Sequence, residues 1–227
     1  MKFAVIEGID GSGKSTQITL LQEHLTQKKI PFKYLHFPRT DSPVYGDLIA
    51  RFLRGEFGNN EQVNPYLVAL IYAGDRKDAT NIIYQWLNEK YLVIADRYVF
   101  SNIAYQCAKL KDQPEKDKLK NWILNFEYSY NKIPQPDINI FLDVPFQFTI
   151  ERLTKDRIGT DRDYLKGVTD IHEENIDFQN KVRDMYIDLA QTEKSLKMIN
   201  CSESKNMMQP TRIFELLLKV LEQNGIL

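Results

Sequence analysis

Residues 8–15 read Gly-Ile-Asp-Gly-Ser-Gly-Lys-Ser, which has the spacing G-x-x-x-x-G-K-[ST] of a phosphate-binding loop. Its glycines allow a tight turn that points backbone N–H groups inward, and the start of a helix adds partial positive charge. Lys14 is expected to reach the β- and γ-phosphates of a nucleoside triphosphate, and the Ser15 hydroxyl to bind Mg²⁺. The loop residues predicted to bind this nucleotide are Gly8, Asp10, Gly11, Ser12, Gly13, Lys14, Ser15 and Thr16.

The sequence on both sides of the loop is the context that such a loop requires. The apolar run Phe3–Ile6 before it predicts a buried strand, and Thr16–Lys28 after it has a helical pattern. A chance match in a stretch rich in glycine and serine is the alternative, and this strand-loop-helix context argues against it. The stretch lacks the pattern G-x-G-x-x-G, so it does not indicate a dinucleotide-binding fold.

Charged residues follow three other predicted strands. Ligands bind at the carboxyl ends of parallel strands, so these residues are expected at the same edge as the loop. Asp96 follows the apolar run Tyr91–Ala95 and is a candidate Mg²⁺ ligand, with a helix cap as the alternative. The guanidinium groups of Arg39 and Arg97 match phosphate oxygens and could hold a second phosphate, although either alone could form a surface salt bridge. Asp143 is a weaker candidate, because a helix N-cap explains it as well.

One helical stretch carries residues that could bind a base. Tyr72 and Arg76 are four residues apart, so they share a face of the helix and could sandwich a flat base and read its edge. The alternative is a Tyr in the core and an ion pair between Arg76 and Asp75. The spacing favours neither.

The most polar stretch of the chain lies between residues 155 and 166, and it predicts a mobile lid at about 152–170. Arg152, Arg157 and Arg162 are spaced five residues apart there. Phosphoryl transfer needs positive charge on the migrating group, which a closing arginine can supply. Aspartates accompany these arginines, so charge alone favours a solvated surface.

Short apolar runs alternate with long amphipathic stretches along the chain. This alternation predicts an α/β fold with about five parallel strands and helices on both faces of the sheet. One long helix is predicted over residues 67–87 from the spacing of its apolar residues. The predicted strands are Phe3–Ile6, Phe32–His36, Tyr91–Ala95, Ile138–Leu142 and Leu196–Asn200.

The bulk composition narrows the class of protein. A chain of 227 residues with 43% hydrophobic residues fits a single domain over 1–227. A net charge of −1 argues against nucleic-acid polymers and membrane surfaces as partners. The two cysteines, Cys107 and Cys201, form neither a disulfide framework nor a zinc cluster. Together with the lack of a signal peptide or apolar span, they predict a cytoplasmic protein.

Four blocks of this sequence together resemble the thymidylate kinase family, a family of nucleoside monophosphate kinases, over nearly the whole chain. The phosphate loop alone is unspecific, whereas D-R-Y-x-x-S-x-x-A-Y-Q in register with F-P-R and D-R is much more specific. The resemblance implies the three-layer P-loop NTPase fold, ATP and Mg²⁺ as cofactors, dTMP as acceptor and a homodimer. The blocks are Glu7–Thr16, Phe37–Arg39, Ala73–Arg76 and Asp96–Gln106.

The resemblance also implies roles for residues around the acceptor. Asp10 would bind the 3′-hydroxyl of the deoxyribose, and Tyr105 would crowd the 2′ position and disfavour a ribonucleotide. Arg39 and Arg97 would hold the acceptor phosphate. Two more residues of these blocks, Phe37 and Ser101, are assigned to the acceptor site.

For the base, the resemblance implies three contacts. Tyr72 occupies a position where the family often has a Phe that stacks on thymine. Arg76 would donate to O4 of thymine, and Asn102 would bond to its N3 edge. Thymine has an N3–H donor between two carbonyl acceptors, so an amide and a guanidinium can complement it.

The catalytic cations would come partly from the lid. Some family members carry an arginine in the phosphate loop, and this loop carries none. The resemblance therefore implies that Arg157 and Arg162 act in catalysis with Lys14 and Arg97, while Arg152 binds ATP. Many members read D-R-x-E where this chain reads Asp-Ile-His-Glu at 170–173, so that arginine is missing. The histidine there is expected at an exposed helix start.

These observations predict a dTMP kinase that transfers the γ-phosphate of ATP to dTMP. A kinase for another nucleotide or nucleoside is the nearest alternative, and the base-reading residues distinguish it. A nucleotide-binding switch or regulatory ATPase is the alternative from another class. The acceptor-site arginines Arg39 and Arg97 would be superfluous for such a protein. The strictness of preference for dTMP over dUMP stays open.

The homodimer implied by the resemblance would use apolar helix faces. The expected contacts are the helices around Tyr66–Trp86 and Ser101–Ala108.

Overall fold

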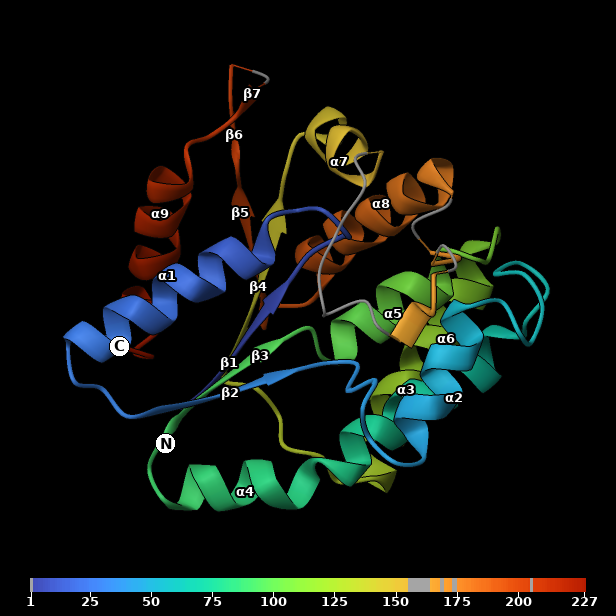
Figure 1. The fold of residues 1–227 in the computed structure, drawn as a ribbon, viewed down its shortest axis with the longest axis horizontal. Helices are drawn as coiled ribbons and strands as arrows, with labels where there is room; N and C mark the ends of the chain where they lie inside the picture. Colours follow the sequence, from blue (N-terminus) through green and yellow to red (C-terminus); the bar gives the residue numbers. More distant parts are fainter. Residues whose placement is uncertain (1, 155–163, 168–169, 173–174, 205) are drawn as a thin grey trace.

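Figure 1 shows the computed structural model, which describes residues 2–154, 164–167, 170–172, 175–204 and 206–227. Its centre is a parallel sheet with the strand order β2-β3-β1-β4-β5. The predicted α/β fold with about five parallel strands is confirmed. The strands are β1 (Lys2–Glu7), β2 (Phe32–His36), β3 (Leu92–Asp96), β4 (Ile138–Asp143) and β5 (Leu196–Asn200).

The register of the sheet brings the carboxyl ends of its strands together. Ile6 near the end of β1 pairs with Asp96 at the end of β3, and Asp96 pairs with His36 at the end of β2. The loops that follow these strands therefore emerge at one edge, where ligands bind in parallel sheets. The peptide bond between Phe37 and Pro38, directly after β2, is cis.

Side chains of β1 alternate between two hydrophobic cores, as the two-residue period of a strand requires. Ala4 and Ile6 belong to one core, and Phe3 and Val5 belong to the other. In Figure 1, helices α1 and α9 lie on one side of the sheet and α3, α5 and α8 on the other. The first core is covered by α1 (Lys14–Gln27) and α9 (Pro210–Gln223). The second is covered by α3 (Pro65–Asp78), α4 (Thr80–Asn88), α5 (Val99–Cys107), α6 (Gln113–Leu124) and α8 (Ile176–Thr192).

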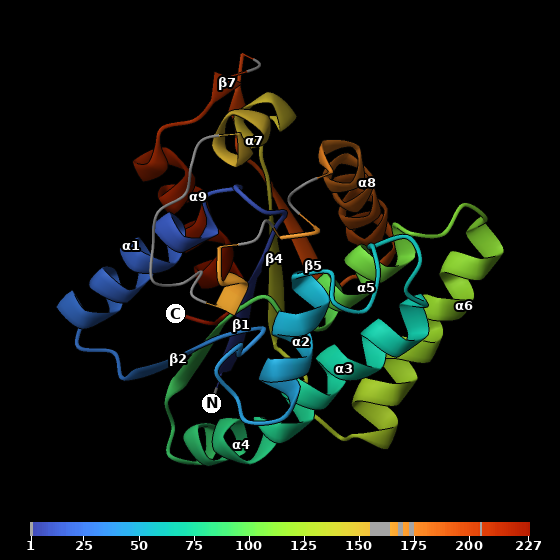
Figure 2. The ribbon, with the colours of Figure 1, turned by 45° about the vertical axis from the view of Figure 1, so that its right-hand side comes forward.

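A third, smaller core lies between α2 (Tyr45–Leu53) and α3, beside the carboxyl edge of the sheet (Figure 2). Ile49 and Phe52 of α2 pack there with Val68 of α3. The two helices approach closely at Gly74, where a Cβ atom would collide with the ring of Tyr45. The glycine thus lets α2 lie against the helix that carries Tyr72 and Arg76.

The prediction of one long helix over residues 67–87 is wrong. The chain forms α3 and α4 instead, with Ala79 between them. The hydroxyl of Thr80, the first residue of α4, donates to the carbonyl of Arg76. Leu67 and Leu70, which belong to the apolar spacing behind that prediction, are 60% and 43% exposed.

The remaining described elements frame the site. A π-helix, η1 (Asn125–Tyr130), continues α6, and α7 (Phe146–Leu153) follows β4. A short antiparallel hairpin of β6 (Ser202–Glu203) and β7 (Asn206–Met207), absent from the sequence prediction, follows β5. Among the described residues, no helix is both long and apolar enough to span a membrane.

Candidate active site

A cleft of about 1320 Å³ runs along the carboxyl edge of the sheet. Pockets for one small molecule typically have roughly 300–1000 Å³, so this cleft has room for two substrates. The phosphate loop forms part of its wall. Helices α3 and α5 contribute Tyr72, Arg76, Asn102 and Tyr105, and we call this part of the cleft the base end. Phe148 and Arg152 of α7 and Met207 and Met208 near β7 line another part.

The phosphate loop connects β1 to α1 as the sequence predicts. Gly13 caps α1 with φ of 81°, a conformation that favours glycine. The ammonium group of Lys14 donates to the carbonyl oxygens of Gly8 and Ile9 at 3.1 and 3.0 Å. Burial lowers the pKa of Lys14 to about 8, and the nearby charge of Arg97 contributes, although adjacent carboxylates oppose it. A phosphate bound at the loop would therefore contact the desolvated ammonium group of Lys14.

The two predicted Mg²⁺ ligands both line this cleft. Asp96 is buried, and its Oδ2 lies 3.3 Å from Nδ1 of His36, whereas its Oδ1 has no hydrogen-bond partner among the described residues. Burial raises the pKa of Asp96, but the bond from His36 and the charge of Lys14 outweigh it, and the net shift is downward. Ser15 is exposed to the cleft. An ionised carboxylate and a hydroxyl fit Mg²⁺, which prefers oxygen ligands and takes the rest from water and phosphates.

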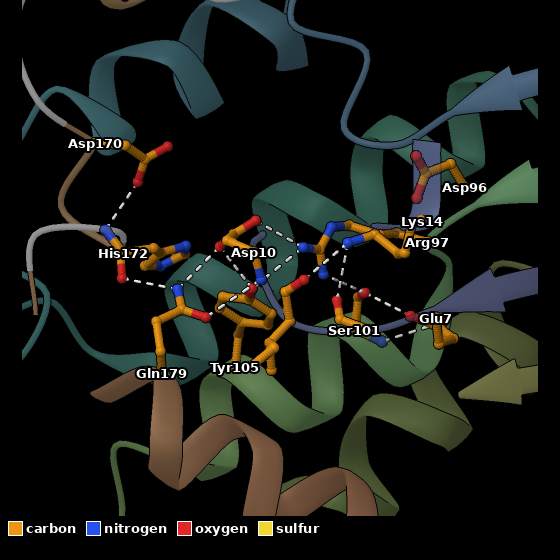
Figure 3. Close-up of polar contacts among 12 residues, drawn as sticks. Glu7, Asp10, Lys14, Asp96, Arg97, Ser101, Tyr105, Asp170, His172 and Gln179 are labelled. Atoms are coloured by element: carbon orange, nitrogen blue, oxygen red, sulfur yellow. Dashed lines mark hydrogen bonds and ion pairs between the residues drawn. The ribbon is translucent and has the colours of Figure 1, made fainter. Parts of the chain in front are cut away.

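Arg97 lies at the centre of a hydrogen-bond network (Figure 3). Its backbone has φ of 66°, which is uncommon for a residue with a side chain. Its Nη2 donates to Oδ1 of Asp10 at 2.7 Å, and its Nη1 to the hydroxyl of Ser101 at 3.2 Å. Oδ2 of Asp10 accepts from the hydroxyl of Tyr105 at 2.7 Å. Burial raises the pKa of Asp10, but the charges of Arg97 and Lys14 and the bond from Tyr105 outweigh it, and the net shift is downward.

Two residues that the sequence analysis passed over hold this network. Glu7, at the end of β1, is fully buried and accepts hydrogen bonds from the hydroxyls of Ser101 and Tyr186 at 2.6 and 2.8 Å. It also accepts from the backbone N–H of Tyr98 at 3.0 Å, so it fixes the turn that carries Arg97. Gln179 on α8 is fully buried as well, and its amide donates to Asp10 at 2.9 Å.

Other charged residues at the rim are engaged with protein groups. Nε of Arg39 donates to Asp75 at 2.9 Å, and its Nη2 donates to Asp78 at 2.6 Å. Arg39 still lines the cleft, as does Phe37. Asp143 forms a bidentate pair with Arg183 of α8 at 2.7 and 3.1 Å, which argues against a role in ligand binding.

At the base end, the structure differs from the alternative in which Arg76 pairs with Asp75. Its partner is not Asp75 but Glu127 of η1, which accepts from Nε at 2.7 Å and also from Nη2. The amide of Asn102 donates to Glu127 and to the carbonyl of Ala69. Tyr72 lines the cleft with Arg76 and Asn102, so the three predicted base contacts lie together.

The expectation of an exposed His172 is wrong. Its side chain lies among the rings of Phe52, Tyr105 and Phe178, and the residue is only 6% exposed. Burial lowers its pKa to about 3, and the nearby charge of Lys109 adds to the shift. The imidazole at the cleft is therefore neutral at physiological pH.

The lid arginines divide into two groups. Arg152 lies in the last turn of α7 with its guanidinium 5.2 Å from the ring centre of Phe148, and both side chains line the cleft. Arg157 and Arg162 lie outside the described residues, as does most of the predicted lid.

Comparison with known proteins agrees with this geometry. The family model described as thymidylate kinase matches residues 6–210. This chain belongs to the thymidylate kinase family. A probable thymidylate kinase 1 from Saccharolobus solfataricus is 34% identical to it over 226 residues, which cover 98% of either chain. A thymidylate kinase from Mycobacterium tuberculosis is 31% identical over 185 residues, or 82% of this chain and 84% of that one.

The fold of the thymidylate kinase family is seen in a solved structure as well. A thymidylate kinase from Candida albicans superposes with a TM-score of 0.71 at 23% identity, covering 99% of this chain and 92% of that chain. At this identity the likeness supports the fold. The three-layer arrangement predicted for this family member is thus confirmed.

Proposed function

We propose that this chain is a dTMP kinase, which uses ATP and Mg²⁺ to convert dTMP into dTDP. The observation that carries the proposal is the ion pair between Arg97 and Asp10, 2.7 Å long, in the same cleft as Lys14. A protein that only bound ATP would need a triphosphate site. Here a second cation, buried and oriented, faces the cleft beside that site.

The acceptor would lie between the base end and the phosphate loop. Its phosphate binds Arg97, and Arg39 adds a second guanidinium at the rim. The side chain of Asp10 is 24% exposed and already accepts bonds from Arg97, Tyr105 and Gln179. A carboxylate has about four lone-pair positions, so Asp10 can also accept from a sugar hydroxyl.

The reaction is a direct transfer between two phosphates held end to end. The acceptor phosphate oxygen is already anionic, so no strong general base is needed, and catalysis rests on positioning and charge neutralisation. Lys14 and the loop N–H groups hold the β- and γ-phosphates, Arg97 holds the acceptor, and Arg157 and Arg162 supply further charge. Ser15 and Asp96 would hold Mg²⁺, which would neutralise charge on the transferring phosphate.

The proposal includes the organisation of the protein. We infer a single domain over residues 1–227, with a lid at about 152–170 that excludes water when both substrates are bound. The dimer face must lie outside α5, because the whole segment Val99–Cys107 is buried within one chain. Exposed Leu67 and Leu70 on α3 are the better candidates. Free, buried Cys107 and Cys201 suit the reducing cytoplasm.

The test is an ADP-release assay with ATP and Mg²⁺ against dTMP, dUMP, UMP, CMP, AMP, GMP and thymidine. Strong stimulation by dTMP and weaker stimulation by dUMP are expected. Stimulation by a different monophosphate would keep the phosphate chemistry and contradict the base assignment. A folded protein that binds ATP but responds to none of these compounds would be a nucleotide-binding switch instead.

A further inference from the structure

Glu127 is a buried carboxylate that touches both of the polar side chains at the base end of the cleft. It is fully buried in the π-helix η1, and it belongs to neither the phosphate loop nor the rim. Its Oε1 accepts from the amide nitrogen of Asn102 at 3.1 Å, and its two oxygens together accept from Arg76. The helices that meet here are α3 and α5, with η1 at the end of α6 (Figure 2).

These contacts fix the orientation of the Asn102 amide. A side-chain amide has an NH₂ group that only donates and an oxygen that only accepts. The NH₂ group of Asn102 donates to Glu127 and, at 3.0 Å, to the backbone carbonyl of Ala69. Both partners are acceptors, so a flipped amide would place its oxygen against two oxygens. Oδ1 of Asn102 points away from them, is buried, and accepts no hydrogen bond from a described residue.

The same carboxylate fixes the Arg76 guanidinium. Nε and Nη2 both donate to Glu127, which leaves Nη1 as the guanidinium nitrogen without a hydrogen-bond partner in the described part of the chain. Arg76 lines the cleft although it is only 2% exposed. The polar atoms of these two cleft-lining residues that are not engaged by described protein groups are thus one acceptor, Asn102 Oδ1, and one donor, Arg76 Nη1.

We propose that Glu127 is a positioning residue that makes the acceptor site select a base with an N3–H donor beside a C4 carbonyl, such as thymine or uracil. This rests on the proposed function, in which Asn102 and Arg76 face the base. Cytosine has an acceptor at N3 and an amino donor at C4. Its N3 would therefore face the acceptor Oδ1 of Asn102, and its amino group would face the donor Nη1 of Arg76. Glu127 touches no ligand itself; it acts by holding Asn102 and Arg76.

The test is the variant Glu127→Gln, which keeps the shape and removes the charge. A glutamine can donate to Asn102 Oδ1 and so allows the amide to flip, while Ala69 still favours the original orientation. The ratio of kcat/KM for dTMP over dCMP should therefore fall about tenfold without reversing, as expected for one hydrogen bond to a charged group. The ratio of dTMP over dUMP should stay within about twofold, because Glu127 does not contact the 5-methyl position.

Three controls separate positioning from a general loss of structure. Glu7→Gln removes another fully buried carboxylate, and it should lower kcat while leaving the ratio of dTMP to dCMP unchanged. In the background of Asn102→Ala, Glu127→Gln should alter that ratio less than it does in the wild type, because one of the two groups through which it acts is gone. If Glu127→Gln shows no cooperative unfolding transition, Glu127→Asp is tested in its place. The same decrease in the ratio of kcat/KM for dTMP over dCMP is expected.

An equal loss of kcat/KM for dTMP and dCMP in the Glu127 variant would overturn the proposal and leave Glu127 a structural residue. A wild-type protein that does not phosphorylate dTMP would contradict the proposed function instead. In that case, the ratio of the Kd values for dTMP and dCMP, measured by calorimetry in both proteins, decides the role of Glu127. If that ratio is the same in the wild type and in the Glu127 variant, the positioning role of Glu127 is overturned.

Discussion

Gln179 and Asp10 are joined by two hydrogen bonds of opposite direction. Nε2 of Gln179 donates to Oδ2 of Asp10 at 2.9 Å, and Oε1 accepts from the backbone N–H of Asp10 at 3.3 Å. The same amide also donates to the carbonyl of His172 at 2.8 Å (Figure 3). One buried side chain of α8 thus links the phosphate loop to the segment that follows the predicted lid.

Replacement of this amide should weaken acceptor binding more than ATP binding. Gln179→Met keeps the length of the side chain and removes all three bonds. A hydrogen bond to a charged group contributes about 1.5–3 kcal/mol, so the KM for dTMP should rise at least about tenfold. The KM for ATP should change less than about twofold. Gln85→Met, at an exposed position of α4, is the control. Equal increases in both KM values would contradict this role for Gln179.

Lys14→Met should reduce activity strongly and leave the fold at least as stable. Loss of one preorganised charge at a transferring phosphate typically lowers kcat by about 100- to 1000-fold. The folded protein lowers the pKa of Lys14 to about 8, which means that burial disfavours its charged form. Stability below that pH is therefore reduced by the charge, and an apolar side chain relieves the cost. Thermal unfolding at pH 7 and steady-state kinetics measure the two effects. Retained turnover would contradict the catalytic role of Lys14.

His172 should make the protein less stable in mild acid. The pKa of His172 falls from 6.5 in the unfolded chain to about 3 in the folded protein. Between these values the unfolded chain binds more protons, so stability falls as the pH decreases. From pH 7 to pH 5 the loss amounts to about 2 kcal/mol for one such group.

The variant His172→Phe tests how much of this loss of stability is due to His172. Phe fits among the aromatic rings of Phe52, Tyr105 and Phe178, and Nε2 of His172 has no described hydrogen-bond partner to lose. Urea unfolding of this variant should show about 2 kcal/mol less destabilisation between pH 7 and pH 5 than the wild type. His24→Gln on α1 is the matched control. The same change in both variants would contradict the assignment to His172.

The five strands follow from the sequence because their apolar runs are continuous and short. Every predicted strand lies within one or two residues of the observed bounds, and β2 and β5 agree in full. The break between α3 and α4 does not follow in this way. Apolar residues continue across Ala79 with helical spacing, and the break depends on how each helix packs. Leu67 and Leu70 continue that apolar pattern although they face outward.

The same distinction between local and distant information applies to the site. The spacing of the phosphate loop predicts Lys14 and Ser15, and the end of an apolar run predicts Asp96, so both signals are local. The partners that orient the acceptor residues come from distant parts of the chain: Gln179 lies 169 residues after Asp10, and Glu127 lies 51 residues after Arg76. A single sequence carries little signal for such contacts. One local signal exists at Glu127, which follows buried Leu119 and Ile123 at four-residue intervals and so places a carboxylate on an apolar face.

A pair of exposed leucines on α3 gives the last prediction, which concerns the homodimer. Leu67 and Leu70 are 60% and 43% exposed and lie three residues apart, so they share one face of α3. Exposed apolar surface that is contiguous marks interaction sites on soluble proteins. We expect the wild type to elute as a dimer with a molar mass of two chains when size exclusion is combined with light scattering.

The double variant Leu67→Glu and Leu70→Glu should elute as a monomer. In a symmetric dimer each substitution occurs twice, so four carboxylates would be buried without partners at the shared face. Burying these charges would weaken dimerisation by several kcal/mol in total. Met198→Glu on edge strand β5 is the matched control, because Met198 is 47% exposed and lies on the sheet rather than on α3. If this double variant stays dimeric, the interface does not lie on this face of α3. A monomeric wild type at all concentrations would contradict the dimer itself.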